Sequence, residues 1–326
     1  MKRLLVIQTA FIGDAILASS ILEKLHEHYP DASIDILVRK GNETLFVNHP
    51  FLNNILVRDK TAGKIKSLFR AISWVRRNKY THIINCHRFL SSGMITLFSG
   101  ADEKTGFDKN PLSFCYDHKI KHEIGNGKHE VERNHELIRH LTDDTFSKPR
   151  LYPSGKDYEL VEKYKTGSYI TIAPASVWFT KQFPQDKWIS FTNNLDSKYK
   201  CYLIGSAGDS PLCEQIVRLS SNSDLVNLAG KLTLLQTAAL MKDARMNYVN
   251  DSAPMHLASA MNAPVTSVFC STVPEFGFTP LSDNSRIVQV SQNPECRPCG
   301  LHGHKECPEK HFRCAKDINV CDLYFE

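Results

Sequence analysis

Residues 247–269 read NYVNDSAPMHLASAMNAPVTSVF, and this stretch contains a complete strand, turn, helix and strand pattern. A short apolar run stops at Asn250, a helical pattern follows, and a second apolar run begins after Ala263-Pro264. Two strands that are joined through a helix lie parallel to each other in one sheet. The stretch therefore predicts an α/β fold built on a parallel sheet.

The turn between the first strand and the helix allows two interpretations. Asp251 or Ser252 can cap the helix, in which case the turn is only structural. Alternatively, the free N–H groups of the first helical turn attract an anion, and a phosphate group can sit there. The stretch alone does not decide between them.

The same alternation of strands and helices runs through the rest of the chain. Strands are expected at 3–8, 33–38, 54–57, 82–85, 169–174, 199–204 and 225–228, and helices at 15–28, 62–78, 156–165, 185–198, 210–220 and 233–243. A segment rich in Asp, Pro and Ser near residue 150 indicates a linker. We therefore expect two Rossmann-like, doubly wound parallel-sheet domains, at 1–150 and 151–326, that face a cleft.

The composition describes an ordinary globular protein. The chain has 326 residues, of which 42% are hydrophobic and 23% charged, with a net charge of +5, too mild to imply nucleic acid. Polar residues interrupt the apolar start after Ile7, which argues against a secretion signal, and no run of 18 apolar residues predicts a membrane span. A cytosolic, reduced protein is expected.

Polar turns follow several of the expected strands. Asp14, in the turn after the first strand, is either a general base or a residue that stabilises the start of a helix. That turn lacks the G-x-G-x-x-G fingerprint of nicotinamide and flavin sites. In the second half, Ser176 and Lys181, the turn at 205–208, and Asp251-Ser252 all follow strands, which predicts a nucleotide diphosphate site.

Residues 60–80 form a basic amphipathic pattern without an acidic side chain. Lys64, Lys66 and Arg70 are interleaved with apolar residues at helical spacing, which suits an anionic lipid surface or a simply solvated helix face. His87-Arg88, just after a strand, is expected to add positive charge near the same site. An anionic acceptor is therefore plausible.

The segment 294–321 is rich in cysteine. Cys296, Cys299, Cys307 and Cys314, with Cys321 and three histidines nearby, could hold a structural zinc ion. Their spacing matches no standard zinc pattern, so free thiols in a reduced protein remain the alternative.

Several of these motifs together resemble the family of bacterial lipopolysaccharide heptosyltransferases. The resemblance rests on LLVIQTAFIGDAILA at 4–18, on 87–93, on 173–188 and on 251–260, and the cysteine-rich segment is similar to that of the heptosyltransferase II branch. It covers nearly the whole length. The family has the GT-B architecture of two Rossmann-like domains and transfers sugars with inversion, without a cofactor.

The resemblance implies a role for each candidate residue. Asp14 would be the general base, and Ser176, Lys181, Asp251, Ser252, Ala253 and His256 would bind an ADP-heptose donor, with Ala253 standing where the family usually has glycine. Gly13, Lys64 and Arg88 would bind a lipid-linked anionic saccharide acceptor. The expected protein is a monomer on the cytoplasmic face of the inner membrane, without a nucleic-acid partner.

Two alternatives stay open from the sequence. The first keeps the reaction but changes the nucleotide-sugar or the acceptor. The second is a non-catalytic protein in which the cysteine cluster binds zinc and the basic helix contacts nucleic acid or another partner.

Overall fold

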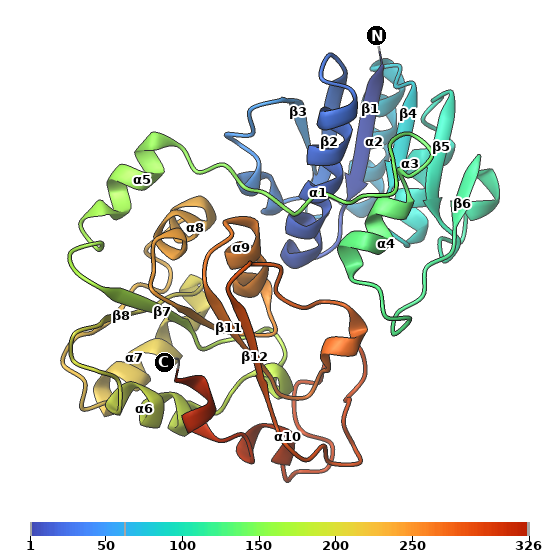
Figure 1. Ribbon diagram of the computed structural model, residues 1–326. Coiled ribbons are helices and arrows are strands. Elements are labelled where there is room, and N and C mark those ends of the chain that lie inside the picture. The colour runs from blue at the N-terminus through green and yellow to red at the C-terminus, as the bar shows by residue number, and fades with distance from the viewer. Residues whose placement is uncertain (1, 62, 325–326) are drawn as a thin grey trace. The chain divides into compact units, whose positions relative to one another are not determined.

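The computed structural model describes residues 2–61 and 63–324, which divide between Tyr152 and Pro153 into two compact units. The expected boundary near residue 150 lies close to this division. Each unit is built around one parallel sheet, and Figure 1 shows the strands of each unit side by side with helices packed around them.

The first unit contains a six-stranded parallel sheet. Its helices and strands are β1 Arg3–Gln8, α1 Ile12–His28, β2 Ser33–Arg39, β3 Leu52–Arg58, α2 Lys64–Arg77, β4 His82–Asn85, α3 Leu90–Leu97, β5 Glu103–Phe107, β6 His118–Ile120 and α4 Glu130–Glu136.

The second unit also contains a six-stranded parallel sheet. Its helices and strands are α5 Gly155–Glu162, β7 Tyr169–Ala173, α6 Gln185–Asn193, β8 Lys200–Leu203, α7 Ser210–Leu219, β9 Leu225–Asn227, α8 Leu234–Lys242, β10 Asn247–Asn250, α9 Ala253–Ala260, β11 Val265–Phe269, β12 Ser285–Gln289 and α10 Arg313–Lys316.

The two sheets share one topology. The order is β3-β2-β1-β4-β5-β6 in the first unit and β12-β11-β10-β7-β8-β9 in the second, which is the same Rossmann order read from opposite edges. In both units the order reverses between the first and fourth strands, at β1 and β4 and at β7 and β10. The predicted α/β class with two Rossmann-like domains is confirmed.

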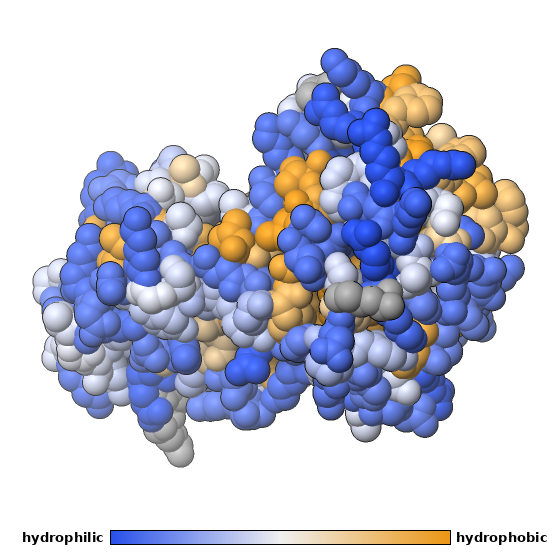
Figure 2. All heavy atoms as spheres, turned by 90° about the horizontal axis from the view of Figure 1, so that it is seen from above, coloured by the Kyte–Doolittle hydropathy of each residue, from blue (hydrophilic) through white to orange (hydrophobic). Residues whose placement is uncertain are grey.

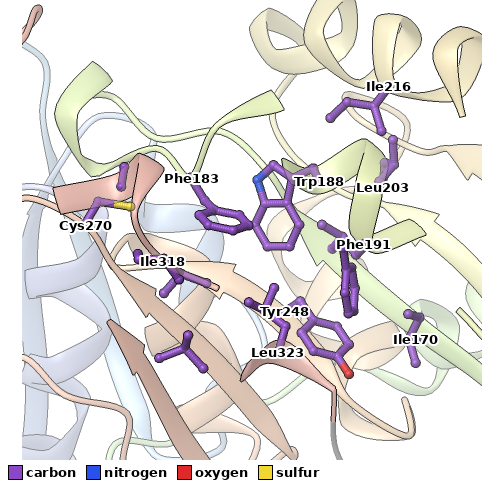
Figure 3. Close-up of a cluster of buried hydrophobic side chains, with 14 of the residues drawn as sticks. Ile170, Phe183, Trp188, Phe191, Leu203, Ile216, Tyr248, Cys270, Ile318 and Leu323 are labelled. Atoms are coloured by element: carbon purple, nitrogen blue, oxygen red, sulfur yellow. The ribbon is translucent and has the colours of Figure 1, made fainter. Parts of the chain in front are cut away.

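The strands at the centre of the second sheet are mostly apolar in sequence, although β10 begins and ends with a buried asparagine. β7, β10 and β11 are buried along their whole length because helices cover both faces of a parallel sheet. In the second unit, Trp188, Phe191 and Tyr248 pack edge to face at the centre of the core, with ring centroids 4.5 and 6.1 Å apart (Figure 3).

The cysteine-rich segment belongs to this core. Phe312, Cys314, Ala315, Ile318 and Leu323 are buried in the same cluster as Trp188. Figure 1 shows the C-terminal end of the chain beside α6, where the Tyr324 hydroxyl donates to the carbonyl of Phe191 at 3.2 Å. The segment is therefore an integral layer of the second unit.

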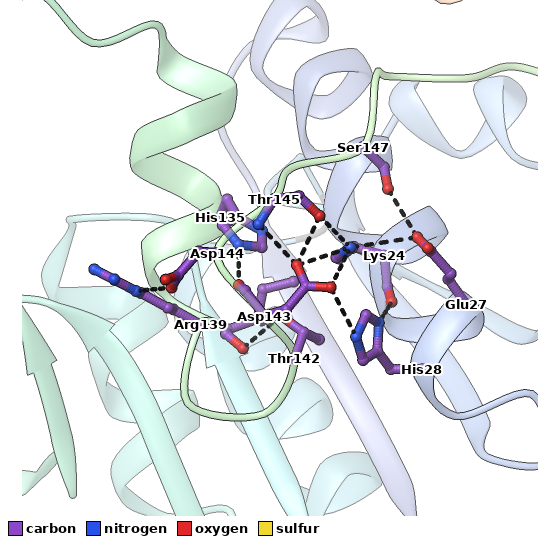
Figure 4. Close-up of polar contacts among 11 residues, drawn as sticks. Lys24, Glu27, His28, His135, Arg139, Thr142, Asp143, Asp144, Thr145 and Ser147 are labelled. Carbon is purple, nitrogen blue, oxygen red and sulfur yellow. Dashed lines mark hydrogen bonds and ion pairs between the residues drawn. The ribbon is translucent and has the colours of Figure 1, made fainter.

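A polar network fastens the end of the first unit to α1. The ammonium of Lys24, which is buried on α1, pairs with Asp143 at 3.0 Å and donates to the Thr145 hydroxyl at 2.8 Å (Figure 4). His28 approaches the same carboxylate at 3.2 Å. A buried ammonium requires such partners, so this network holds residues 143–145 against the helix.

All six helices for which bounds were expected differ from those bounds, by one to five residues at an end. The helix expected at 15–28 begins at Ile12, because extended Phe11 is its N-cap and an acidic residue is favourable in the first turn. The helix expected at 185–198 ends at Asn193. The helix expected at 62–78 begins at Lys64 after Gly63, whose φ of +98° suits glycine, and residue 62 lies outside the described residues.

Trp188 offers a test of this core. Its side chain is fully buried, and within the described part of the chain its indole N–H finds no hydrogen-bond partner. We expect Trp188→Ala to lower the free energy of unfolding of the second unit by about 3–5 kcal/mol, because it leaves a cavity. Trp188→Phe should cost much less, since it fills most of the space and removes the unpaired donor. The free energy of unfolding is measured by urea unfolding followed by circular dichroism. An equal loss in Trp188→Ala and Trp188→Phe would contradict this packing.

Candidate functional site

In the second unit, the candidate site lies where β7 and β10 end. These neighbouring strands flank the reversal of strand order, which is where open α/β sheets bind their ligands. The side chain of Asn250, the last residue of β10, is buried and donates to the carbonyls of Pro174 at 2.9 Å and Ala175 at 3.3 Å. Its Oδ1 accepts from the Phe183 N–H at 2.9 Å. Asn250 therefore fixes both ends of the loop that carries Ser176 and Lys181.

Lys181 and Asp251 form the central contact of this site. The Lys181 ammonium lies 2.7 Å from the Asp251 carboxylate, and the Thr272 hydroxyl donates to the same carboxylate oxygen at 2.6 Å. Both charged side chains are largely buried. The ion pair joins the loop after β7 to the turn after β10 and directs a cation to this edge of the sheet.

The helix-capping interpretation of the turn at 251–252 is wrong at the level of the side chains. Ser252 occupies the N-cap position of α9, but it makes no capping hydrogen bond, and its hydroxyl faces the carbonyl of Asn250 at 3.4 Å. Asp251 is instead used by Lys181 and Thr272. The first turn of α9 begins at half-buried Ala253, and His256 is buried one turn further along.

The loop with Ser176 is also held from within. Ser176 is half-buried, and its carbonyl accepts from the Gln182 side chain at 2.7 Å. Phe179–Lys181 forms a short 3-10 helix, which places Lys181 at its end. Ser176, Lys181, Asp251 and Ser252 therefore lie on two adjacent turns of one sheet edge.

The cysteine-rich segment supports the same loop. The backbone N–H of Thr180 donates to the carbonyl of His304 at 3.1 Å, and the N–H of His304 donates to the Thr180 hydroxyl at 2.8 Å. Gly303 has a φ of +76°, and a Cβ placed there would lie 2.7 Å from the Thr180 hydroxyl oxygen and 3.1 Å from Cγ of Lys181. Glycine is therefore needed at 303, where the tail touches the residue beside the candidate lysine.

Arg297 anchors the start of that segment. Its buried guanidinium donates to the carbonyl of Thr272 at 2.7 Å and to the side chain of Gln289 at 2.8 Å. The N–H of Cys299 donates to the carbonyl of Ser271 at 2.9 Å. Both contacts reach the segment after β11 that presents Thr272 to Asp251.

The four candidate metal-binding cysteines are free thiols that lie near one another. Burial, together with the charges of Cys299, Cys296 and Cys307, raises the pKa of Cys314 to about 12. Cys296 Sγ lies 3.8 Å from Nε2 of His311. In residues 2–61 and 63–324, no three of these sulfurs lie within 4.8 Å of one another.

In the first unit, Asp14 lies in the first turn of α1, directly after β1. Gly13 and Asp14 both belong to the helix, at its second and third positions after Phe11. The carboxylate is half-buried. Burial, and then the charge of Glu130, raise its pKa to about 6, against the opposing effects of Arg88 and the N–H groups of Phe11 and Asp14. Asp14 thus combines the helix-start position with a pKa suited to a general base.

Cations gather at the carboxyl ends of the strands next to Asp14. Arg58, at the end of β3, is buried and donates to the Ser91 hydroxyl at 2.6 Å. The pKa of Lys60 is lowered by partial burial and by the charges of Arg58, Arg39 and Lys64. Arg88, which follows β4, donates to His122 at 3.0 Å. Lys64 is exposed at the start of α2.

The expectation that His87 adds positive charge is wrong. Burial and the neighbouring charges of Lys60, Arg88 and Arg58 lower its pKa to about 4, so the imidazole is neutral. Its Nδ1 forms a 2.7 Å hydrogen bond with the hydroxyl of Thr9 instead. His87 therefore ties the end of β4 to the end of β1.

Much of the apolar stripe of α2 faces the core. Ala71 and Val75 are buried in the main cluster of the first unit, and Leu68 and Ile72 pack against it. Ile65 and Phe69 remain exposed beside Lys66 and Arg70. In the described part of the chain, no helix is both long and apolar enough to cross a membrane.

The structure thus brings the donor candidates together on one unit and the base and acceptor candidates on the other. Sequence reasoning missed Asn250, Thr272 and Arg58 as members of these sites. All three stand at or just beyond strand ends, so position alone could have suggested them. Their partners lie far away in the sequence, and no local spacing reveals them.

Comparisons with known proteins identify a family that the chain matches. A family model described as glycosyltransferase family 9 (heptosyltransferase) matches residues 67–312. Lipopolysaccharide heptosyltransferase 3 of Escherichia coli K12 is 28% identical over 283 residues, covering 80% of each chain, and heptosyltransferase 2 of the same strain is 22% identical over 318 residues, covering 88% of each. The solved ADP-heptose lipopolysaccharide heptosyltransferase II of E. coli superposes with a TM-score of 0.76 at 20% identity, covering 97% of this chain and 98% of that one.

The structural match confirms the expected GT-B fold. Because the matching family consists of transferases, the alternative of a non-catalytic zinc- or nucleic-acid-binding protein is excluded. The family model covers most of the length, taking in the later part of the first unit and most of the second. The chain therefore belongs to glycosyltransferase family 9, the heptosyltransferases, and is an enzyme of that family.

Proposed function

We propose that the protein transfers a heptose from ADP-heptose to the inner core of a lipopolysaccharide precursor, with inversion at the anomeric carbon and with Asp14 as the general base. The observation that carries the proposal is the pair of polar sites at the two strand-order reversals, a carboxylate with a raised pKa in one unit and an anchored lysine in the other. The family relatives named for heptose transfer support the same reaction.

The second unit would bind the donor. Displacement of a nucleoside diphosphate leaves negative charge on its phosphate oxygens, which a nearby cation and N–H donors stabilise. Lys181, the hydroxyls of Ser176 and Ser252, and the N-terminus of α9 supply such groups. Asp251 holds the Lys181 ammonium in place, while Ala253 and His256 belong to the helix whose first turn would meet the diphosphate.

The first unit would activate the acceptor. An attacking hydroxyl must lose a proton as it bonds to the anomeric carbon, and a carboxylate with a pKa of about 6 can accept it near neutral pH. The bond to the departing diphosphate breaks as the new bond forms on the opposite face, so the configuration inverts. Arg88, Lys64 and the adjacent Arg58 would hold an anionic, lipid-linked saccharide, with Gly13 leaving room beside Asp14.

A pair of substitutions separates the two roles. Asp14→Asn should abolish heptose transfer, because it removes the base, and should leave the rise in Tm caused by ADP nearly unchanged. Lys181→Met should instead remove most of that rise, because it takes away the cation that faces the diphosphate. Both are measured by a product assay with ADP-heptose and by thermal unfolding with ADP.

The outcomes of this pair distinguish the parts of the proposal. Full turnover by Asp14→Asn would rule out Asp14 as the base. Stronger protection by UDP or GDP than by ADP would favour another nucleotide-sugar. An unchanged ADP response in Lys181→Met would remove the lysine from the donor site.

The raised pKa of Asp14 gives the reaction a defined pH dependence. Because the carboxylate must be ionised to accept a proton, kcat should fall as the pH drops below about 6. The charge of Arg88 lowers the pKa of Asp14, so Arg88→Met should move this acid limb to higher pH. Arg88→Lys, which keeps the charge, is the control and should leave the limb in place. If the acid limb of kcat lies at the same pH in the unmodified protein and in both variants, measured at saturating substrates, another group controls the pH dependence.

We further propose that α2 contacts the anionic cytoplasmic face of the inner membrane, where a lipid-linked acceptor would be found. Lys66 and Arg70 are exposed beside Ile65 and Phe69, which are 73% and 62% exposed. Figure 2 shows, for one face of the molecule, a mostly hydrophilic surface with smaller hydrophobic patches. Such a combination suits a surface of acidic lipid head groups.

Charge reversal tests the membrane contact. Lys66→Glu with Arg70→Glu should weaken binding to vesicles that contain acidic lipid by at least about tenfold, since each basic residue near such a surface contributes about 1 kcal/mol. The matched control, Lys156→Glu with Lys163→Glu, makes the same change in net charge on α5 and at its C-cap. Equal binding by both variants in a vesicle sedimentation assay would exclude α2 as the contact.

A further inference from the structure

Three histidines converge on one glutamate at the amino-terminal edge of the first sheet. His82, Glu103 and His118 stand at the first positions of β4, β5 and β6, and His140 follows α4. From Oε1 of Glu103, Nε2 of His140 lies at 2.7 Å and Nε2 of His118 at 3.3 Å, and from Oε2, Nε2 of His82 lies at 3.6 Å. This edge is opposite to the strand ends that carry Asp14 and Arg88, so the cluster is separate from the proposed active site.

The spacing of these atoms suits a small tetrahedral cation. Zinc binds imidazole nitrogen and carboxylate oxygen at about 2.0–2.2 Å, which places neighbouring ligand atoms roughly 3.3–3.5 Å apart. Two of the three contacts to Glu103 are already near that value. The ligand atoms of Glu103, His118 and His140 all lie within 4.8 Å of one another, and the 2.7 Å contact of His140 would have to lengthen by about 0.6 Å. His82 lies outside this group of three and faces the other carboxylate oxygen of Glu103.

A hydrogen bond behind His82 favours its role as a ligand. Nδ1 of His82 lies 2.8 Å from the hydroxyl of Thr81, and that hydroxyl donates to the carbonyl of Arg3 at 3.1 Å. The Thr81 hydroxyl donates its proton to the carbonyl of Arg3, so the Thr81 oxygen accepts a hydrogen bond from Nδ1–H of His82. The lone pair of Nε2 of His82 therefore faces Glu103. In a metal-binding histidine, one ring nitrogen usually binds the metal while the other donates a hydrogen bond that fixes the orientation of the ring.

The cluster is open enough for an ion to enter. The side chains of Glu103, His118 and His140 are 29%, 41% and 24% exposed. The rings of His118 and His140 lie side by side with centroids 3.9 Å apart, and both border an open hollow with Arg139 and Glu136. Burial lowers the pKa of His82 and of His140. The positive charge of Lys2 acts on His82 and His140 and opposes the binding of a cation beside them. The negative charge of Asp102 favours the binding of a cation beside His82.

We propose that His82, His118, His140 and Glu103 form a binding site for a divalent transition-metal cation, with zinc as the ion that the ligand set suits best. Three imidazoles and one carboxylate are the borderline ligands that zinc, cobalt and nickel share, in contrast to the all-oxygen sites of magnesium and calcium. The ion would join β4, β5, β6 and the segment after α4, and it would stabilise that part of the first unit. Its distance from the active-site edge makes the role structural.

The test uses the full chain, freed of metal with a chelator and titrated with Co²⁺. Cobalt bound by imidazole and carboxylate absorbs in the visible range, whereas thiolate ligands add a strong near-ultraviolet band, so the spectrum separates this site from the cysteine-rich segment. We expect a visible band without the thiolate band at the first equivalent, its displacement by Zn²⁺, and a rise in Tm with either ion. His118→Ala with His140→Ala should weaken this binding by more than about tenfold, the lower end of the loss that changes around metal ligands cause.

Two further variants make the result decisive. His28→Ala removes an imidazole that faces a carboxylate at 3.2 Å in the same unit and should leave cobalt binding unchanged. Glu103→Gln keeps the shape of the side chain but removes its charge; it should lose the cobalt spectrum while the metal-free protein keeps its Tm. Cobalt binding that is unchanged in Glu103→Gln and in the double histidine variant, or that shows only the thiolate spectrum, would overturn the proposal. No binding by the unmodified chain would overturn it as well, since the cluster would then be a hydrogen-bonded network only.

Discussion

The reversal of strand order in each sheet is the constraint on which the two candidate sites depend. Successive right-handed crossovers build the sheet outward from its first strand in one direction, and the fourth strand then starts on the other side. The loops that leave the first and fourth strands must therefore diverge to opposite faces of the sheet, and the edge between them is not covered by a connection. In this protein, Asp14 and Arg88 follow one such pair of strands, and Lys181 and Asp251 follow the other. The same topology, used twice, yields one acidic and one basic candidate group at equivalent positions.

Buried polar contacts then convert these open edges into defined sites. Asn250 has four backbone partners on the loops around it, so the loop after β7 cannot move without leaving polar atoms unpaired. The ion pair between Lys181 and Asp251 adds a further contact between the loops, and the Thr272 hydroxyl fixes the Asp251 carboxylate through a hydrogen bond. Arg297 in turn donates to the carbonyl of Thr272. The cysteine-rich segment is thus part of the support of the candidate donor site, through Arg297 on one side and the contacts of Gly303 and His304 with Thr180 on the other.

The sequence was sufficient for features that depend on local pattern, and insufficient for those that depend on distant partners. Buried strands such as β1 and β7 are largely apolar runs, so the hydrophobic pattern found them. Sequence reasoning missed β5 and β6, because EKTGF and HKI are polar and short and become strands only by pairing with β4 and with each other. The candidate residues Asp14, Lys181 and Asp251 were identified by their place after strands, yet the ion pair between Lys181 and Asp251 joins positions 70 residues apart (251 − 181). For the same reason, His87 was wrongly expected to be charged. Burial in the fold lowers its pKa most, and two of the three cations that lower it further, Arg58 and Lys60, lie at the end of β3 and just after it.

The electrostatics of the first unit must meet two opposing demands if the proposed reaction is correct. An anionic acceptor is attracted by cations such as Arg58, Lys60 and Arg88, but the same cations lower the pKa of any carboxylate beside them and weaken it as a base. In this unit, burial and the charge of Glu130 outweigh the effect of Arg88 and keep the pKa of Asp14 near 6. Glu130 in turn stays ionised because Arg133 lies 2.7 Å away and His122 3.4 Å away, and these contacts keep its own pKa below the ordinary value despite burial. The chain from Arg133 through Glu130 to Asp14 would therefore allow the proposed general base to keep its raised pKa in a unit that also carries Arg58, Lys60 and Arg88.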